Sequence, residues 1–329
     1  MYTPNSLGAA LIMMIATALL WGSWASTYKG VKNYRFELFY WDYAIGIFLI
    51  SLILGHTMGS IGNDPNSLPN NIHAADPSNI VWAMVGGVIF NLANLLLVAA
   101  LDMAGMAIAF PLAIGIALVV GVVLSYVLQP KGNVALLGGG VLCALIAVTM
   151  IGKAYGTLRR GGQGVSRKSV ITCIVSGVLM GLWAPFVTRA MTHTSMNGGP
   201  LGPYATAIFL TFGALLSCFI WNIYFMKHPL VGEPVSFSGF FRGPASGHML
   251  GLLGGIIWGV AMVFDLVAAN YTGVAISYAI GQSAPMVAAL WGVFVWKEFK
   301  GASSKATMYL VLMFVFYCLA ILLVAKANG

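Results

Sequence analysis

A stretch of 23 residues occurs twice in this chain, and both copies are almost wholly apolar. Segment 86–108 returns 168 positions later as segment 254–276, without a gap and with eight identical pairs. The match runs through one apolar span, a turn and the start of the next span, so composition alone does not account for it. A doubled apolar unit indicates a membrane protein built from internal repeats. The identical pairs are Gly86/Gly254, Gly87/Gly255, Ile89/Ile257, Ala93/Ala261, Ala100/Ala268, Gly105/Gly273, Ala107/Ala275 and Ile108/Ile276.

The composition excludes a soluble globular protein. Apolar residues make up 60% of the 329 residues and charged residues only 7%, with a mean hydropathy of +0.91, whereas soluble domains carry roughly 25% charged residues. We therefore expect an all-α polytopic membrane protein with ten transmembrane helices of about 20 residues each. The predicted spans are 7–28, 38–58, 79–101, 105–128, 133–152, 169–191, 203–226, 248–269, 273–296 and 305–326.

The basic residues are concentrated on one side of the predicted membrane. Of the 16 Lys and Arg residues, 13 lie in turns that follow odd-numbered spans, and only Lys131, Arg189 and Lys326 lie on the other side. The positive-inside rule then places the richer side in the cytoplasm and both termini outside, in a cytoplasmic (inner) membrane. Because the net charge of +8 is spread over short turns, it does not indicate nucleic-acid binding.

The repeat divides the chain into two five-helix units, residues 1–155 and 169–329, joined by a basic cytoplasmic linker at 156–168. A copy that begins after five spans enters the membrane from the opposite face, so the two units are predicted to be inverted repeats. A weaker match supports the first spans: Gly22, Trp24 and Ala25 correspond to Gly181, Trp183 and Ala184 at an offset of 159.

Two amides in the third span are candidate substrate ligands. Asn91 and Asn94 are three residues apart and share a helix face, and their repeat counterparts, Gly259 and Met262, are not polar amides. Polar side chains in mid-membrane are costly and commonly mark a transport pathway. The alternative is a hydrogen bond between helices.

Aromatic residues and one further amide complete the predicted substrate site. Tyr278 and Gln282 share a face of the ninth span, and Trp21 and Trp24 belong to an aromatic stripe in the first. Planar polar groups and aromatic faces suit sugar recognition, with Trp183 and Trp258 as candidate companions. Trp and Tyr also anchor helices at membrane interfaces, which is the alternative for each of them.

Two carboxylates are candidate proton carriers. Asp265 lies within the eighth span, where its repeat counterpart is Leu97; the alternative is a position near the outer interface. Asp42 opens the second span, where capping or anchoring at the helix N-terminus is the alternative role.

No cofactor, metal or enzymatic activity is predicted from the sequence. The chain has no GxxxxGK[ST], HExxH or GxSxG motif, which are the signatures of phosphate loops, zinc peptidases and serine hydrolases. The four cysteines all fall within apolar spans, where packing is their ordinary role.

Several local strings resemble those of the drug/metabolite transporter superfamily, and within it the bacterial glucose/ribose porter group. They are WGSWASTYK at 21–29, FELFYWDY at 36–43, IFNLAN at 89–94 and AFPLAIGIAL at 109–118. L-rhamnose/proton symporters and plant ureide permeases are similar at a greater distance. The ureide permeases carry a long hydrophilic central loop, and the short segment 153–168 of this chain argues against that group.

The resemblance implies secondary uptake of a small polar solute by alternating access, commonly coupled to protons. Our sequence-based hypothesis is therefore a monosaccharide transporter. The alternative is a transporter of a nitrogenous solute such as a ureide, nucleobase or nucleoside, since amides and stacking rings serve these equally well. A third hypothesis is a membrane sensor that binds ligand without moving it. A homodimer is compatible with each.

Overall fold

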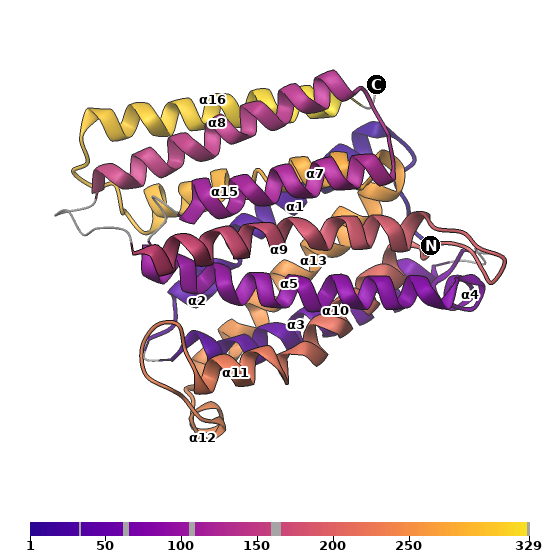
Figure 1. Ribbon diagram of the computed structural model, residues 1–329, viewed down its shortest axis with the longest axis horizontal. Helices are drawn as coiled ribbons and strands as arrows, with labels where there is room; N and C mark the ends of the chain where they lie inside the picture. Colours follow the sequence, from indigo (N-terminus) through magenta and orange to yellow (C-terminus); the bar gives the residue numbers. More distant parts are fainter. Residues whose placement is uncertain (33, 62–65, 105–108, 159–165, 328–329) are drawn as a thin grey trace.

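Long helices running side by side make up nearly all of the structure (Figure 1). The computed structural model describes residues 1–32, 34–61, 66–104, 109–158 and 166–327. Within these ranges no β-strand is present, only two isolated bridges. The helices of the first half are α1 (Leu7–Ser23), α2 (Ala25–Lys29), α3 (Phe36–His56), η1 (Met58–Ser60), α4 (Leu68–Ala74), α5 (Pro77–Ala104), η2 (Phe110–Ile114), α7 (Gly115–Leu128) and α8 (Val134–Leu158). Those of the second half are α9 (Arg167–Thr192), α10 (Pro203–Cys218), α11 (Trp221–Lys227), α12 (Phe237–Phe241), α13 (Ala245–Thr272), α14 (Val274–Gly281), α15 (Ala284–Leu290), η3 (Trp291–Val295) and α16 (Ser304–Lys326).

Nine segments of the described chain are long and apolar enough to cross a bilayer. They correspond to nine of the ten predicted spans, and the described part of the tenth is the shorter apolar helix Leu112–Leu128. The start of that predicted span, including the repeat positions Gly105, Ala107 and Ile108, lies outside the described residues. The protein is thus an all-helical, multi-pass membrane protein.

Three of the predicted spans contain a break between two helices, and the seventh span is divided at Phe219 and Ile220 into α10 and α11. The first span is divided at Trp24 into α1 and α2, and the ninth is divided at Gln282 and Ser283 into α14 and α15. Pro285 sits in the first turn of α15, where its missing N–H is tolerated because that N–H would have no helical partner. Interrupted helices at membrane depth are found where the backbone lines a cavity.

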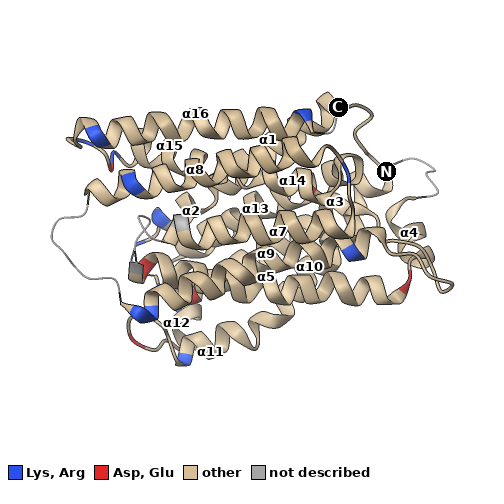
Figure 2. Cartoon of the chain, turned by 45° about the horizontal axis from the view of Figure 1, so that its top comes forward, with Lys and Arg blue, Asp and Glu red and all other residues tan. Residues whose placement is uncertain are grey.

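The two ends of the bundle differ in charge (Figure 2). At one end, hereafter the basic end, Lys168 donates a hydrogen bond to Leu230 O, Arg35 donates to Val231 O, and Lys29 pairs with Glu298. At the opposite end, hereafter the terminus end, Tyr2 N donates to Met58 O of η1, and Asn133 N donates to Ala327 O. The helices α1, α3, α5 and α13 all connect the two ends.

Helix pairs in one half of the chain recur in the other half. α5 packs against α9 and α10, while α13 packs against α1 and α3. α7 lies along α9, and α15 along α1. α8 and α16, the last spans of the two halves, pack against each other at one edge of the bundle (Figure 1).

Glycine contacts between these helices recur in the same way. Gly87 of α5 lies against Leu210 O of α10, and its repeat counterpart Gly255 of α13 lies against Tyr43 O of α3. In each case an added Cβ would overlap the carbonyl oxygen. Small residues let helix backbones approach this closely in membranes. The identical glycines of the sequence repeat therefore occupy equivalent helix crossings.

Candidate functional site

Five of the nine predicted site residues line one cavity, which lies between the first span, the break after α14 and the helices α5 and α13. The cavity has a volume of about 180 Å³. Trp21 and Trp24 come from the first span, Asn94 from α5, Trp258 from α13, and Gln282 from the break after α14. Both halves of the chain therefore contribute walls. The other lining residues are Gly22, Ala25, Phe90, Leu97, Leu101, Ile114, Met180, Trp183, Gly281, Ala284, Pro285 and Ala288.

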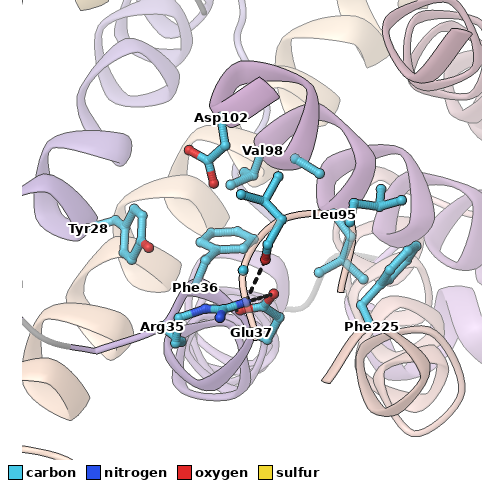
Figure 3. A pocket seen from close by; sticks show the side chains of 12 residues that line it. Tyr28, Arg35, Phe36, Glu37, Leu95, Val98, Asp102 and Phe225 are labelled. Atoms are coloured by element: carbon cyan, nitrogen blue, oxygen red, sulfur yellow. Dashed lines mark hydrogen bonds and ion pairs between the residues drawn. The ribbon is translucent and has the colours of Figure 1, made fainter. Parts of the chain in front are cut away.

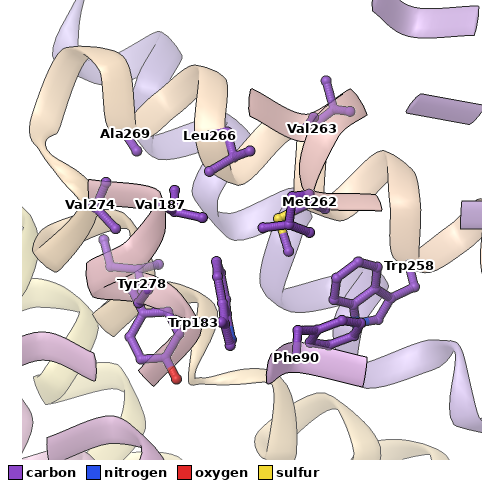
Figure 4. Packing of buried hydrophobic residues seen from close by; sticks show 14 of the residues in the cluster. Phe90, Trp183, Val187, Trp258, Met262, Val263, Leu266, Ala269, Val274 and Tyr278 are labelled. Atoms are coloured by element: carbon purple, nitrogen blue, oxygen red, sulfur yellow. The ribbon is translucent and has the colours of Figure 1, made fainter. Parts of the chain in front are cut away.

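Stacked aromatic rings form much of the cavity wall. Phe90 lies on Trp258 with ring centroids 4.4 Å apart and planes 27° apart, and Trp21 stacks on the same Trp258 at 5.8 Å. Trp183 meets Trp21 edge to face at 6.4 Å. Figure 4 shows Phe90 and Trp258 overlapping, with the Trp183 ring standing across from them. Such rings present large rigid faces on which a flat solute can stack.

The polar groups of the cavity are few. Asn94 lies in the wall and donates from Nδ2 to the hydroxyl of Tyr40 at 3.3 Å. Gln282 stands at the break between α14 and α15. Mostly apolar walls with a small number of amides are typical of small-molecule sites, where the amides fix orientation.

Asn91 and Tyr278 are placed behind the cavity wall. Asn91 is fully buried and donates from Nδ2 to Ser217 Oγ at 2.7 Å, which ties α5 to α10. The Tyr278 hydroxyl donates to Met180 O at 3.1 Å, and its ring contacts Trp183 edge to face at 5.4 Å. Neither residue lines the cavity. Both are positioned to hold cavity-lining helices in place.

Asp265 is fully buried and does not line the cavity. Its Oδ1 accepts a hydrogen bond from Ser277 Oγ at 2.7 Å, and its Oδ2 has no partner among the residues that the structure describes. It lies behind Gly281, where an added Cβ would be 3.6 Å from Oδ1. A buried carboxylate with one unbonded oxygen is costly in an apolar interior, which marks it as a functional candidate.

Asp42 lies away from the cavity, toward the basic end. Its Oδ2 is 2.7 Å from His248 Nδ1, which belongs to the first turn of α13. His248 Nε2 donates to Phe240 O at 3.1 Å. Asp42 thus ties α3 to the start of α13 and, through His248, to α12.

Several cavity residues were not predicted from the sequence, Phe90 above all. It is the repeat counterpart of Trp258, so the offset of 168 carried a signal for it. Trp183, expected only as a companion, is likewise the counterpart of Trp24 at the offset of 159. Leu97, Leu101, Ile114 and Met180 carry no such signal, because apolar side chains in apolar spans look alike whether they face lipid, protein or solute.

Comparison with known proteins identifies relatives along the whole chain. A family model described as ureide permease matches residues 39–157 and 165–327. Ureide permease 1 and ureide permease 2 of Arabidopsis thaliana are each 23% identical, and the alignments cover 100% of this chain and 99% of each relative. Ureide permease 5 of the same plant is 24% identical, covering 100% of this chain and 96% of its own. One solved structure, titled only as the crystal structure of a protein, superposes with a TM-score of 0.66 at 18% identity, covering 98% of this chain and 100% of that one.

Fold and relatives together define a multi-pass membrane transporter. The chain belongs to the ureide permease family. This corrects two sequence-based expectations: the glucose/ribose porter assignment and the preference for a monosaccharide are not supported, and the nitrogenous alternative is favoured instead. The short central segment was misleading because the length of a solvent-exposed loop is free to vary without disturbing the helix bundle.

Proposed function

We propose that the protein carries a small nitrogenous solute, with a ureide as the first candidate, across the membrane by alternating access. The observation that carries the proposal is the central cavity, which is lined by aromatic rings and two amides from both halves of the chain. A ureide is a urea derivative, so it has flat amide faces, N–H donors and carbonyl acceptors. Stacking on Trp21 and Trp258 would hold the faces, and the Asn94 and Gln282 amides would pair with the edges.

The proposal includes two inverted repeats, residues 1–155 and 169–329, joined by the linker 156–168, most of which lies outside the described residues. Ten membrane helices then result if the region 105–128 crosses once. The recurring helix pairs and the paired contacts of Gly87 and Gly255 support this arrangement. The cavity lies between repeat-equivalent rings, Phe90 with Trp258 and Trp24 with Trp183. A solute on a pseudo-two-fold axis is reached from either side by rocking one repeat against the other.

We place the basic end in the cytoplasm, following the positive-inside rule, and both termini on the outside of the cytoplasmic membrane. In this orientation the structure corresponds to an inward-facing state. Leu97 and Leu101 line the cavity on the side toward the basic end and are half-buried, whereas their repeat counterparts Asp265 and Ala269 are buried. If Leu97 and Leu101 became buried and Asp265 and Ala269 came to line the cavity, the cavity would open to the outside.

Proton coupling is assigned to Asp265 in this proposal, with Asp42 as the second candidate. Asp265 is preferred because one of its oxygens lacks a partner in the described structure, whereas Asp42 is bonded to His248. In proteoliposomes, solute accumulation by Asp265→Asn should no longer respond to an imposed pH gradient, and that by Asp42→Asn should still respond. Unchanged accumulation in both variants would reject both carriers.

The substrate class is tested by binding and by flux with the same four probes: allantoin, uracil, uridine and glucose. A solute that binds the folded state raises the thermal midpoint of the purified protein in detergent. We expect a rise with allantoin and its saturable uptake into proteoliposomes. A rise and uptake with glucose alone would overturn the nitrogenous proposal, and binding without uptake of any probe would indicate a sensor.

Site variants show whether the cavity is the place of binding. Trp258→Ala removes a stacking face and should raise the half-saturating allantoin concentration about tenfold. Trp82→Ala is the matched control, because Trp82 is 36% exposed on the bundle surface and does not line the cavity. Equal effects of the two substitutions would place the site elsewhere.

A further inference from the structure

A second cavity lies at the basic end of the bundle (Figure 3), and several of its lining residues are sequence neighbours of residues that line the first. Its volume is about 280 Å³. Tyr28 of α2, Val98 and Asp102 of α5, and Arg35 and Glu37 at the start of α3 line it, together with Phe225 of α11. It is therefore more polar than the central cavity and is not part of the site described above.

The two cavities share two walls. On α2, Ala25 lines the central cavity and Tyr28, three residues on, lines the second. On α5, Leu101 lines the central cavity and Asp102 the second. Both helices run toward the basic end, and one helical turn advances 5.4 Å. The second cavity thus adjoins the central one on a neighbouring face of α5 and reaches nearer the basic end along α2.

The charges around the second cavity have different roles. Arg35 is held by Glu37, with Nη2 to Oε1 at 2.7 Å, and it donates to Glu233 O at 2.7 Å and Val231 O at 2.9 Å. Its charge is neutralised and its donors fasten a loop to α3. Asp102 forms no hydrogen bond or ion pair with another described residue. Its carboxylate faces the opening from α5, across from the Tyr28 ring (Figure 3).

We propose that this second cavity is a binding site for a solute with N–H donors, occupied between the central cavity and the basic-end solvent. The inference rests on the proposed function and deepens it. A carboxylate is an acceptor only, so Asp102 favours neutral or cationic N–H groups and repels anions. Tyr28 supplies an aromatic face next to it. A urea-type solute can donate two N–H groups from one edge to the two carboxylate oxygens.

The test uses a single reporter thiol in the second cavity. Val98→Cys is reacted with a membrane-impermeant methanethiosulfonate, with the wild-type protein and its four natural cysteines as the labelling blank. We expect allantoin to slow the reaction at least fivefold. The protection should be lost when Asp102→Asn is added and kept when Glu233→Gln is added, since the Glu233 side chain is exposed and does not line the cavity.

The outcomes separate this inference from the proposed function. Allantoin uptake without protection of Val98→Cys, or protection that Asp102→Asn leaves intact, would overturn the second site and keep the transporter. Protection that depends on Asp102 in a protein that moves no allantoin would keep the site and overturn the proposed transport. Acetate, an anion of similar size to a carboxylate side chain, should give no protection; protection by acetate would overturn the role of Asp102.

Discussion

The second cavity at the basic end can be compared with an apolar cluster toward the terminus end, which includes Val187, Val263, Leu266 and Ala269 (Figure 4). The two are built from corresponding parts of the two halves. By the offsets of the sequence repeat, Tyr28 corresponds to Val187, and Val98 to Leu266. The first two line an open cavity (Figure 3), whereas Val187 and Leu266 are both 0% exposed in a packed cluster (Figure 4). Equivalent positions therefore have opposite environments in one molecule.

The difference shows that the repeated backbone does not decide which positions line a cavity. The side chains of each half and their contacts decide it. Asp102 corresponds to Asn270, and the position before α3 that holds Arg35 is taken by the uncharged Gly202 at the start of the equivalent helix α10. At the terminus end, Asp76 accepts a hydrogen bond from Ser195, and Asn79 donates to His193 O at 2.9 Å and to Gly199 O at 3.0 Å. These bonds fasten the start of α5 to the loop after α9.

The largest effect is expected at the two equivalent contacts between a glycine and a carbonyl of the neighbouring helix. Gly87→Val and Gly255→Val should each prevent stable folding, because an added side chain would overlap a carbonyl of the neighbouring helix. Gly138→Val is the control, since an added Cβ there meets nothing within 4 Å. The measurement is the monodisperse yield in detergent. A folded Gly255→Val beside an unfolded Gly87→Val would break the equivalence of the two crossings.

Accessibility gives the next largest effect. In the absence of solute, Val98→Cys should react with a water-soluble thiol reagent at least tenfold faster than Leu266→Cys, because only the first position lines a cavity. Reaction rates are read by mass spectrometry of the intact protein. Similar rates at the two positions would show that both sides open equally in the resting protein.

The stability lost on truncating a side chain should be larger at the buried position than at the position that lines the cavity. Leu266→Ala empties a fully packed position and is expected to lower the free energy of unfolding by about 3 kcal/mol. Val98→Ala, at a half-buried position beside a cavity, should cost less than about 1 kcal/mol. Thermal midpoints in one detergent supply the comparison. A larger loss at Val98 would contradict the assignment of open and closed sides.

The smallest effect concerns pH at the terminus end. The hydrogen bonds from Ser195 and from Ser78 lower the pKa of Asp76 below its ordinary value. Its contribution to stability is therefore full above the unfolded-state pKa of about 4 and is lost as the pH falls through the lower folded-state value. Asp76→Asn should show a smaller drop in thermal midpoint between pH 6 and pH 3 than the wild type. Glu233→Gln, which removes an exposed carboxylate at the basic end, serves as the control. An equal drop in Asp76→Asn and in the wild type would contradict the role of these bonds.

Much of the fold could be predicted because apolar span length and repeat spacing are local properties of the chain. Nine of the ten predicted spans agree with the described structure in approximate position. The helix break at Trp24 was not expected, since no proline marks it. The site was predicted in part: Trp21, Trp24, Asn94, Trp258 and Gln282 share a cavity, whereas Asn91, Tyr278, Asp42 and Asp265 lie outside its lining.

The residues outside the cavity show why polarity along the chain is an incomplete guide. A polar side chain in an apolar span indicates that it needs a partner, but the partner is either a solute or another helix. Asn91 bonds Ser217, which lies 126 residues away in sequence. Asp42 bonds His248 at a separation of 206 residues. Such distant pairings are fixed by how the helices pack, which one sequence does not reveal.

The sequence by itself determined that this chain lies in a membrane, that it is helical, and that its apolar units are doubled, because each of these follows from composition and spacing. The tertiary structure decided which of the repeated positions face a cavity and which are packed shut. Repeated segments share local chemistry and therefore form the same helices. Only their long-range contacts, which differ between the basic end and the terminus end, place some of the repeated positions at a cavity and bury their counterparts.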